Sequence, residues 1–152
     1  MTTQNRSPSA SGEAKTQQRP PIVLTTMDRE RLIALMRNLP DSTNQEVAKF
    51  LREEVERADI ATGDVAANSV VRMGSDVKFI DHDDGRIHRA KLVFPEEARE
   101  RRCISVLSSV GSVLIGLGPG QSIWWTELGR ERHLSVLEVY NECRLTVTGL
   151  RR

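Results

Sequence analysis

Three glycines between positions 116 and 120 have the spacing of a phosphate-binding loop, the first candidate for chemistry in this chain. Such a loop follows a strand and precedes a helix, so that backbone N–H groups at the helix N-terminus face the phosphate. Here a short apolar helix, Ser109 to Ile115, is expected before the glycines, and no lysine follows them. We therefore interpret Gly116, Gly118 and Gly120 as the end of that helix followed by a Pro119–Gly120 turn.

A second candidate is the run from Asp81 to Gly85, Asp-His-Asp-Asp-Gly, which is rich in metal-ligating residue types. An EF-hand loop ends in a carboxylate at its twelfth position, where this sequence has Leu92. We interpret the run as a solvated hairpin turn. The two cysteines, Cys103 and Cys143, have no metal-ligand spacing and are expected to be free thiols.

Ser108 and Ser109 are adjacent hydroxyls that a neighbouring base would turn into nucleophiles. The three histidines, His82, His88 and His133, form no recognisable triad or elbow motif with them. The residues therefore predict no catalytic site, no metal and no cofactor.

The chain has 152 residues, enough for one domain with a core and a small appendage. It has 22 Lys and Arg against 21 Asp and Glu, a balance that gives no field favouring DNA, RNA or an anionic membrane. No apolar run approaches the roughly 20 residues that span a bilayer, and the N-terminus lacks a signal peptide's apolar segment. We expect a cytoplasmic protein.

Changes in composition divide the chain into four parts. Residues 1–21 are rich in Ser, Gln, Pro and Thr and are expected to be a disordered tail. Residues 22–62 begin with a β-prone run, Ile22 to Thr26, that should add an edge strand or dock on the body, and continue as a helical arm. A linker at 61–69 leads into the main domain, 63–143, and residues 144–152 form a C-terminal tail.

The arm is expected to begin with an amphipathic helix from Met27. Thr26 is its expected N-cap, Asp28 lies on its polar face, and Pro40 ends it because proline disfavours helical geometry in the preceding residue. Its apolar face consists of Leu32, Ile33, Met36 and Leu39.

A second helix is expected to begin at a capping box, formed either by Ser42 and Gln45 or by Thr43 and Glu46. Its apolar face consists of Val47, Leu51, Val55 and Ala58. Two facing apolar stripes joined by a few residues predict a short antiparallel helical hairpin.

Beyond the linker the periodicity changes to that of strands, which are expected at 76–80, 86–94, 103–106, 122–126 and 133–140. A charged connection, 96–102, precedes the third strand, and the short apolar helix follows it. This order predicts an α+β domain in which an antiparallel sheet wraps around one short helix. Trp124 and Trp125 then point to opposite faces, one into the core and the other toward a contact surface.

Several segments carry a family resemblance. Ile104 to Gly116, ISVLSSVGSVLIG, resembles the signature ISxxSPxxxALLGK in the C-terminal domain of the bacterial transcript-cleavage factors GreA and GreB. Gly74 to Val77, GSDV, resembles their GSxV strand entry. Leu92 to Pro95, LVFP, resembles the LVYP of the Rnk group, the regulators of nucleoside diphosphate kinase. Arg19 to Ile22 and the short arm are similar to the start of Rnk proteins, so the resemblance covers residues 19–142.

The resemblance implies an FKBP-like domain behind a coiled-coil arm, docked on the β′ subunit of RNA polymerase at the rim of its secondary channel. The docking loop, residues 105–109, contributes Ser105, Leu107, Ser108 and Ser109 to that contact. Leu107 replaces the acid of the family's DSP tripeptide. We expect Leu107 to be largely exposed, so that docking relies on apolar burial at about 25 cal/mol per Å². The alternative is that Leu107 belongs to the core.

The arm tip, residues 40–46, departs further from the family. In GreA the corresponding tip reads GDLxENAEY, whose Asp and Glu hold a metal ion in the polymerase's active centre. Asp41 stands at the place of that Asp, but Asn44 stands at the place of the Glu, and an amide adds no negative charge to a cation site. The resemblance, with this departure, predicts a non-enzymatic Rnk-like regulator that binds RNA polymerase without stimulating transcript cleavage.

Two other functions are compatible with the sequence. The implied fold fits a peptidyl-prolyl isomerase, although three Phe, two Trp and one Tyr are a poor supply for an aromatic-lined proline pocket. The family name fits an adaptor that regulates nucleoside diphosphate kinase, either directly or through transcription. No direct DNA binding and no membrane contact are expected.

Overall fold

The structure, a computed structural model, describes residues 19–141. Its elements are β1 (Val23–Leu24), α2 (Thr26–Arg37), α3 (Gln45–Arg57), β2 (Asp59–Ile60), α4 (Asp64–Asn68), β3 (Asp76–Asp81), β4 (Arg86–Val93), a 3-10 turn (Pro95–Glu97), β5 (Cys103–Ser105), α5 (Ser109–Leu114), β6 (Ser122–Glu127) and β7 (Arg130–Tyr140). Most of the predicted N-terminal tail, the C-terminal tail and Cys143 lie outside the described residues.

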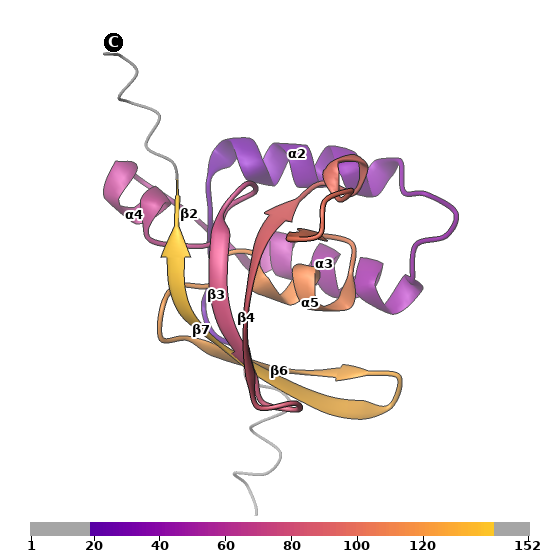
Figure 1. The fold of residues 1–152 in the computed structure, drawn as a ribbon. Helices are drawn as coiled ribbons and strands as arrows, with labels where there is room; N and C mark the ends of the chain where they lie inside the picture. The colour runs from indigo at the N-terminus through magenta and orange to yellow at the C-terminus, as the bar shows by residue number, and fades with distance from the viewer. Residues whose placement is uncertain (1–18, 142–152) are drawn as a thin grey trace, which may run out of the picture.

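Five strands form one curled sheet in the order β5-β4-β3-β7-β6 (Figure 1). β3 pairs antiparallel with β4 and β7, and β6 pairs antiparallel with β7, as predicted. The prediction of a wholly antiparallel sheet is wrong for β5, which pairs parallel with β4. The charged connection explains the difference, because it turns at Pro95–Glu97 and brings the chain back beside Lys91 before β5 begins.

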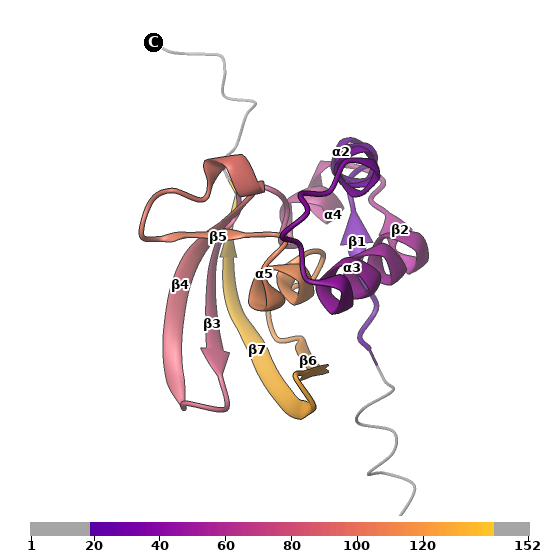
Figure 2. The same ribbon diagram turned by 90° about the vertical axis from the view of Figure 1, so that its right-hand side faces the viewer.

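The sheet has one face toward the core and one toward solvent. Alternation along β3 places Val77 and Phe79 in the interior, where both are buried. The helices α2, α3 and α5 lie on that side, and no helix within residues 19–141 covers the outer face of β3, β4 and β7 (Figures 1 and 2). Leu114 of α5 is fully buried, which confirms the short apolar helix as part of the core.

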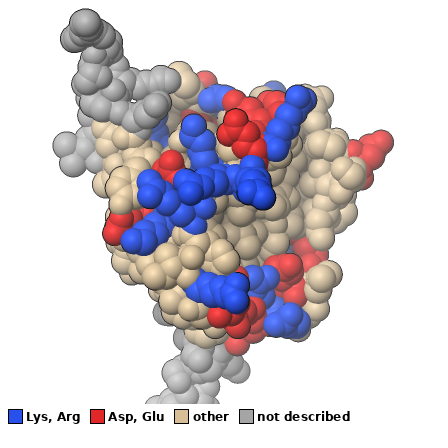
Figure 3. Space-filling view, in the orientation of Figure 1, with Lys and Arg blue, Asp and Glu red and all other residues tan. Residues whose placement is uncertain are grey.

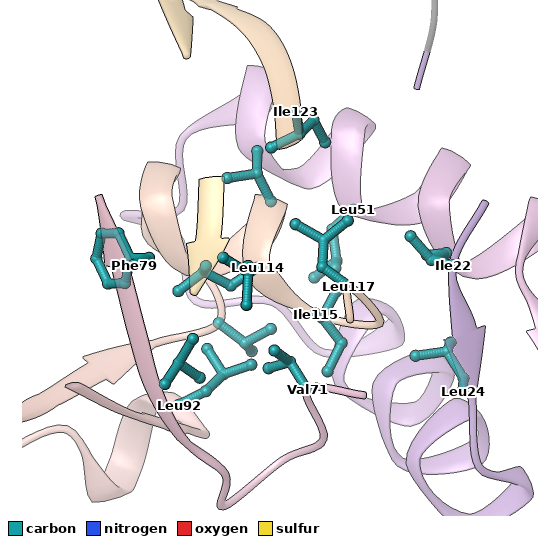
Figure 4. Packing of buried hydrophobic residues seen from close by; sticks show 14 of the residues in the cluster. Ile22, Leu24, Leu51, Val71, Phe79, Leu92, Leu114, Ile115, Leu117 and Ile123 are labelled. Carbon is teal, nitrogen blue, oxygen red and sulfur yellow. The ribbon is translucent and has the colours of Figure 1, made fainter. Parts of the chain in front are cut away.

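The arm and the main domain share one hydrophobic cluster. Ile22, Leu24 and Leu51 from the arm pack in the same cluster as Leu114 and Leu117 of the main domain (Figure 4). The run from Ile22 adds a short strand, as predicted: β1 pairs parallel with β2 in a separate two-stranded sheet. The arm is therefore held against the main domain by its own core residues.

Gly116 ends α5 and lets the arm approach. Its φ is +83°, the left-handed region that favours glycine, and a Cβ at this position would lie 2.7 Å from the Cβ of Ile22. Gly120 has a φ of +88° in the following turn. These observations confirm the interpretation of the glycines as a helix end and a turn, and Ile22 fills the space beside Gly116.

Both arm helices begin at caps that differ from the prediction. Thr25, one residue before the expected Thr26, caps α2 by accepting the N–H of Asp28 at 3.0 Å. Asn44 caps α3, so neither predicted capping box forms. A capping box needs a side chain three residues into the helix to reach back, whereas the Asn44 amide oxygen alone satisfies two N–H groups.

Two acidic side chains of the arm helices are buried. Asp28 accepts the backbone N–H of Met73 at 2.9 Å, which joins α2 to the segment before β3. Glu54 is paired with Arg57 at 2.5 Å and with Arg19 at 3.3 Å. The prediction that Asp28 lies on the polar face is wrong, because a partner distant in sequence compensates its burial.

The predicted linker at 61–69 is not wholly irregular, because the helix α4 follows Gly63, whose φ is +99°. Within residues 19–141, no helix has the length and apolar character needed to cross a membrane.

Candidate functional site

A groove of about 760 Å³ lies between the arm and the main domain. Three segments line it: the arm tip with the start of α3, the docking loop with the start of α5, and β6 with the turn that follows it. The predicted site residues on its wall are Asn44, Ser105, Leu107, Ser108 and Ser109. Asp41 is exposed and does not line the groove. Tertiary packing thus brings the two predicted surfaces, the docking loop and the arm tip, to one place.

Hydroxyl groups fold the docking loop. The Ser105 hydroxyl oxygen accepts the N–H of Leu107 at 3.0 Å. Ser108 is the N-cap of α5: its hydroxyl accepts the N–H of Gly111 at 3.0 Å and donates to the carbonyl of Ser105 at 2.6 Å. A Cβ on Gly111 would lie 1.9 Å from that carbonyl oxygen. The serines therefore have a structural role, which is to hold a tight turn at the groove.

Ser109 ties the docking loop to the sheet. Its hydroxyl donates to Oε1 of Glu127 at 2.5 Å and accepts the indole N–H of Trp125 at 3.1 Å. Arg132 binds the same carboxylate oxygen at 2.6 Å. The Glu127 carboxylate is already paired with the Arg132 guanidinium, so these contacts hold Ser109 in place between the docking loop and the sheet.

Arg132 is the centre of an ion cluster behind the groove wall. Its guanidinium lies 2.9 Å from Asp81, 2.6 Å from Asp83 and 2.6 Å from Glu127, and it also lies over the Trp125 ring at 5.0 Å. The Arg132 side chain is only 16% exposed, so solvent screens these pairs less than surface pairs. The cluster fixes β6 against β7, and Arg132 compensates the negative charge of Glu127, the acid that contacts Ser109 of the docking loop.

Leu107 is half-buried and packs against the core cluster while lining the groove. The expectation that it is largely exposed is wrong. The turn held by Ser105 and Ser108 folds the loop back over the core, so that part of the leucine side chain is covered. The alternative, that Leu107 belongs wholly to the core, is wrong as well, because the residue also lines the groove.

The groove also contains apolar residues that the sequence did not predict as site residues. Leu128 is 78% exposed in the turn after β6 and has a φ of +52°. Phe50 lies under the guanidinium of Arg19 at 4.5 Å. Trp124 is half-buried and stacks on His133, with ring centroids 3.9 Å apart, whereas Trp125 is buried as predicted for one of the pair. The signal for Leu128 was an apolar residue beside Gly129 between two strands, where turns are usually polar.

At the arm tip, the Asn44 side chain caps the N-terminus of α3. Its amide oxygen accepts the N–H of Glu46 at 2.7 Å and that of Val47 at 3.4 Å. Within residues 19–141, one group of acidic and histidine side chains lies close enough together to hold a metal ion, and this group is in the main domain and not at the arm tip. The tip, residues 40–46, therefore has two exposed carboxylates, Asp41 and Glu46, and a helix cap.

That group lies in the β3–β4 turn and consists of Asp81, Asp84 and His88. Its oxygens already have partners: Asp81 binds Arg132, and Asp84 accepts the N–H of Arg86 at 2.8 Å and contacts His88 at 3.0 Å. The Arg86 N–H, and then His88, lower the pKa of Asp84. The geometry is that of the predicted hairpin turn.

Comparison with known proteins gives two family matches that together span most of the described residues. Residues 20–60 match the Rnk N-terminus, and residues 66–141 match the C-terminal region of the transcription elongation factors GreA/GreB. The chain is 36% identical over 124 residues to the regulator of nucleoside diphosphate kinase of Escherichia coli K12, covering 80% of this chain and 90% of that protein. The same values hold for the Shigella flexneri protein of that name.

A solved structure is similar as well. The prokaryotic transcription elongation factor GreA/GreB from Nitrosomonas europaea is 30% identical and has a TM-score of 0.62, covering 81% of this chain and 100% of that one. The likeness therefore extends over both the arm and the main domain.

Proposed function

The chain belongs to the Rnk family of GreA/GreB-related regulators, and we propose that it is a non-catalytic transcription regulator that binds RNA polymerase through the groove. The observation that supports this most is the meeting of the docking loop and the arm tip on one groove. A partner that enters the groove contacts both segments at once. In this proposal the partner surface is the rim of the secondary channel on the β′ subunit.

The absence of catalysis is part of the proposal and rests on the polar contacts of the site. The Ser109 hydroxyl is shared between Glu127 and Trp125, and the carboxylate is neutralised by Arg132. At the arm tip, a metal-holding pair of carboxylates would need a second acid beside Asp41, where Asn44 instead caps α3. We therefore propose that the chain does not stimulate transcript cleavage.

The arrangement of the arm supports the same view. Asp28 and the shared hydrophobic cluster hold the arm against the main domain, so its tip lies beside the docking loop. We propose that the tip acts as part of the docking surface. Describing the two arm helices as a short coiled coil and the main domain as FKBP-like is part of this proposal.

A second candidate function comes from the relatives, which are named regulators of nucleoside diphosphate kinase. We propose regulation of that kinase as the alternative, either through direct binding or through transcription. Binding of purified kinase to the full chain, measured beside polymerase binding, separates these routes.

The test uses Leu128, which lines the groove and is exposed enough to be replaced without loss of packing. Leu128→Asn removes an apolar contact, and asparagine tolerates a positive φ better than leucine. We expect it to weaken binding to purified RNA polymerase about tenfold, since burial of a leucine contributes roughly 1.5–3 kcal/mol. Met27→Gln is the control, because Met27 is 66% exposed on α2 and does not line the groove.

Two results would contradict the proposal. Equal binding of the parent and of Leu128→Asn would show that the groove is not the docking site. Transcript cleavage stimulated by the parent chain in a purified polymerase assay would overturn the absence of cleavage. Asn44→Glu restores the family's acid at the tip. It should still not stimulate cleavage, because we propose that the arm, whose second helix spans only the 13 residues Gln45–Arg57, is too short to reach the active centre of the polymerase.

A further inference from the structure

The outer face of the sheet is a second surface without an assigned role. Register places the cross-strand pairs Asp76 with Lys91, Lys78 with Arg89, and Ile80 with Ile87 on β3 and β4. Because Val77 and Phe79 point inward, these three pairs point outward. No helix of residues 19–141 covers them (Figures 1 and 2).

Large apolar side chains are exposed on this face. Ile87 is 58% exposed, and Tyr140 is 47% exposed opposite Asp76. The register of β7 against β3 shifts between Lys78 and Phe79, which leaves Leu137 as an additional, exposed residue. Exposed apolar side chains grouped on one face are typical of a binding surface.

Cations accompany these side chains. Lys78 lies 3.7 Å from Glu138 and Arg89 lies 3.4 Å from Asp76, and these side chains are all more than a third exposed. Lys91 is exposed and forms no ion pair within the described part of the chain. In Figure 3, Lys and Arg side chains form a band across this face with fewer Asp and Glu among them.

A column of stacked rings lies at one end of the face. Trp124 stacks on His133 at 3.9 Å with an interplanar angle of 5°, and His133 stacks on His82 at 4.1 Å and 15°. The column crosses from β6 over β7 to the residue that follows β3. Its rings are stacked with nearly parallel planes, and His82 at its end is exposed, so that a further flat ring can stack on it.

We propose that the outer face of β3, β4 and β7 binds single-stranded nucleic acid, with phosphates at Lys78, Arg89 and Lys91 and a base stacked on the ring column. Cations that follow a backbone, next to rings that stack on bases, are the two components of sequence-tolerant single-strand binding. A duplex cannot use the ring column, because its bases are already stacked. A second copy of the chain fits less well, because a face-to-face contact would oppose the same three cations.

The charge balance of the whole chain gave no reason to expect this site. Only the fold gathers three cations on the outer face of β3 and β4, where β3 contributes Asp76 and β7 contributes Glu131 and Glu138. About three phosphate contacts predict weak binding. The logarithm of the binding constant should fall with the logarithm of the salt concentration at a slope of about −2.

The experiment measures binding of the full chain to a labelled oligouridylate of about 12 nucleotides by fluorescence anisotropy, from about 20 to about 200 mM salt. Lys78→Ala with Lys91→Ala should weaken binding at low salt and make the slope shallower by about 1.4, the value for two phosphate contacts. Lys49→Ala with Arg52→Ala on α3 is the matched control, with the same change in net charge away from the face. It should leave the slope unchanged.

A separate variant tests stacking. His82→Ala should weaken binding about fivefold at an unchanged slope, because a ring contributes stacking and not phosphate neutralisation. Circular dichroism melting checks that each variant is folded.

Three outcomes would overturn the proposal. The first is an equal loss of binding in the control pair. The second is equal binding of an oligoglutamate of similar charge, which would assign the face to an acidic protein. The third is dimerisation of the parent chain that Ile87→Asn abolishes, measured by sedimentation.

Discussion

Replacing Asp28 separates the effect of a buried hydrogen bond from that of a buried charge. Asp28 is 4% exposed and accepts the N–H of Met73 at 2.9 Å, a contact that joins the arm to the main domain. Burial raises the pKa of Asp28 above its ordinary value, although the Met73 N–H and the charges of Arg72 and Arg31 act in the opposite direction. The hydrogen bond therefore stabilises the fold while the buried charge opposes it.

Two variants of Asp28 should lower the free energy of unfolding by different amounts. Asp28→Ala leaves the Met73 N–H without an acceptor, which costs about 1–3 kcal/mol of unfolding free energy. Asp28→Asn keeps an acceptor of the same shape and removes the charge, so it should stay within about 1 kcal/mol of the parent at about pH 7. Urea denaturation followed by circular dichroism measures both.

The pH dependence has a definite sign. Because the folded pKa lies above the unfolded value, the folded state still holds the Asp28 proton at pH values where the unfolded state has released it. Stability contributed by this group is therefore greatest below the unfolded pKa and is lost as pH rises through the folded pKa. Asp28→Asn has no titrating group at this position. The parent should therefore lose stability relative to the variant as pH rises from the unfolded to the folded pKa of Asp28.

A difference between the parent and Asp28→Asn that stays constant with pH would refute the reasoning about the charge. An alanine variant as stable as the asparagine variant would refute the reasoning about the hydrogen bond.

The other predictions concern packing, capping and the glycine at the arm contact. Leu114→Ala should lower the unfolding free energy by about 2–5 kcal/mol, and a urea midpoint equal to the parent's would place α5 outside the core. Asn44→Ala should cost about 0.5–2 kcal/mol in thermal melts whereas Asn44→Asp stays near the parent, and equal losses would contradict the cap. Gly116→Ala should cost more than about 1 kcal/mol, because φ is +83° and the new Cβ meets Ile22; an unchanged melting temperature would show that the arm moves away freely.

Local pattern was enough to predict most elements. The strands β3, β4, β6 and β7 and the helix α5 lie within a few residues of their expected ranges, because alternation and helical period are properties of neighbouring residues. The caps at Thr25 and Asn44 were misplaced by one or two residues, since several adjacent Ser, Thr and Asn side chains are equally good caps in sequence.

Features that depend on distant partners could not be predicted in the same way. Asp28 looked like a polar-face residue because its acceptor role toward Met73 spans 45 positions. The parallel pairing of β5 depends on how the charged connection folds back beside Lys91, and no periodicity encodes that path.

The sequence by itself determined the family and the order of most elements, and it indicated the two segments that we propose for docking, because short motifs and local periods specify them. Only the tertiary structure decided that the arm tip and the docking loop share one groove, that Leu107 is half-buried and that Leu128 stands exposed beside them. It also decided which cations share the outer sheet face, although the whole chain is nearly neutral. The physical reason is that burial and charge segregation arise from contacts between residues far apart in the chain, and a single sequence records residue types without those contacts.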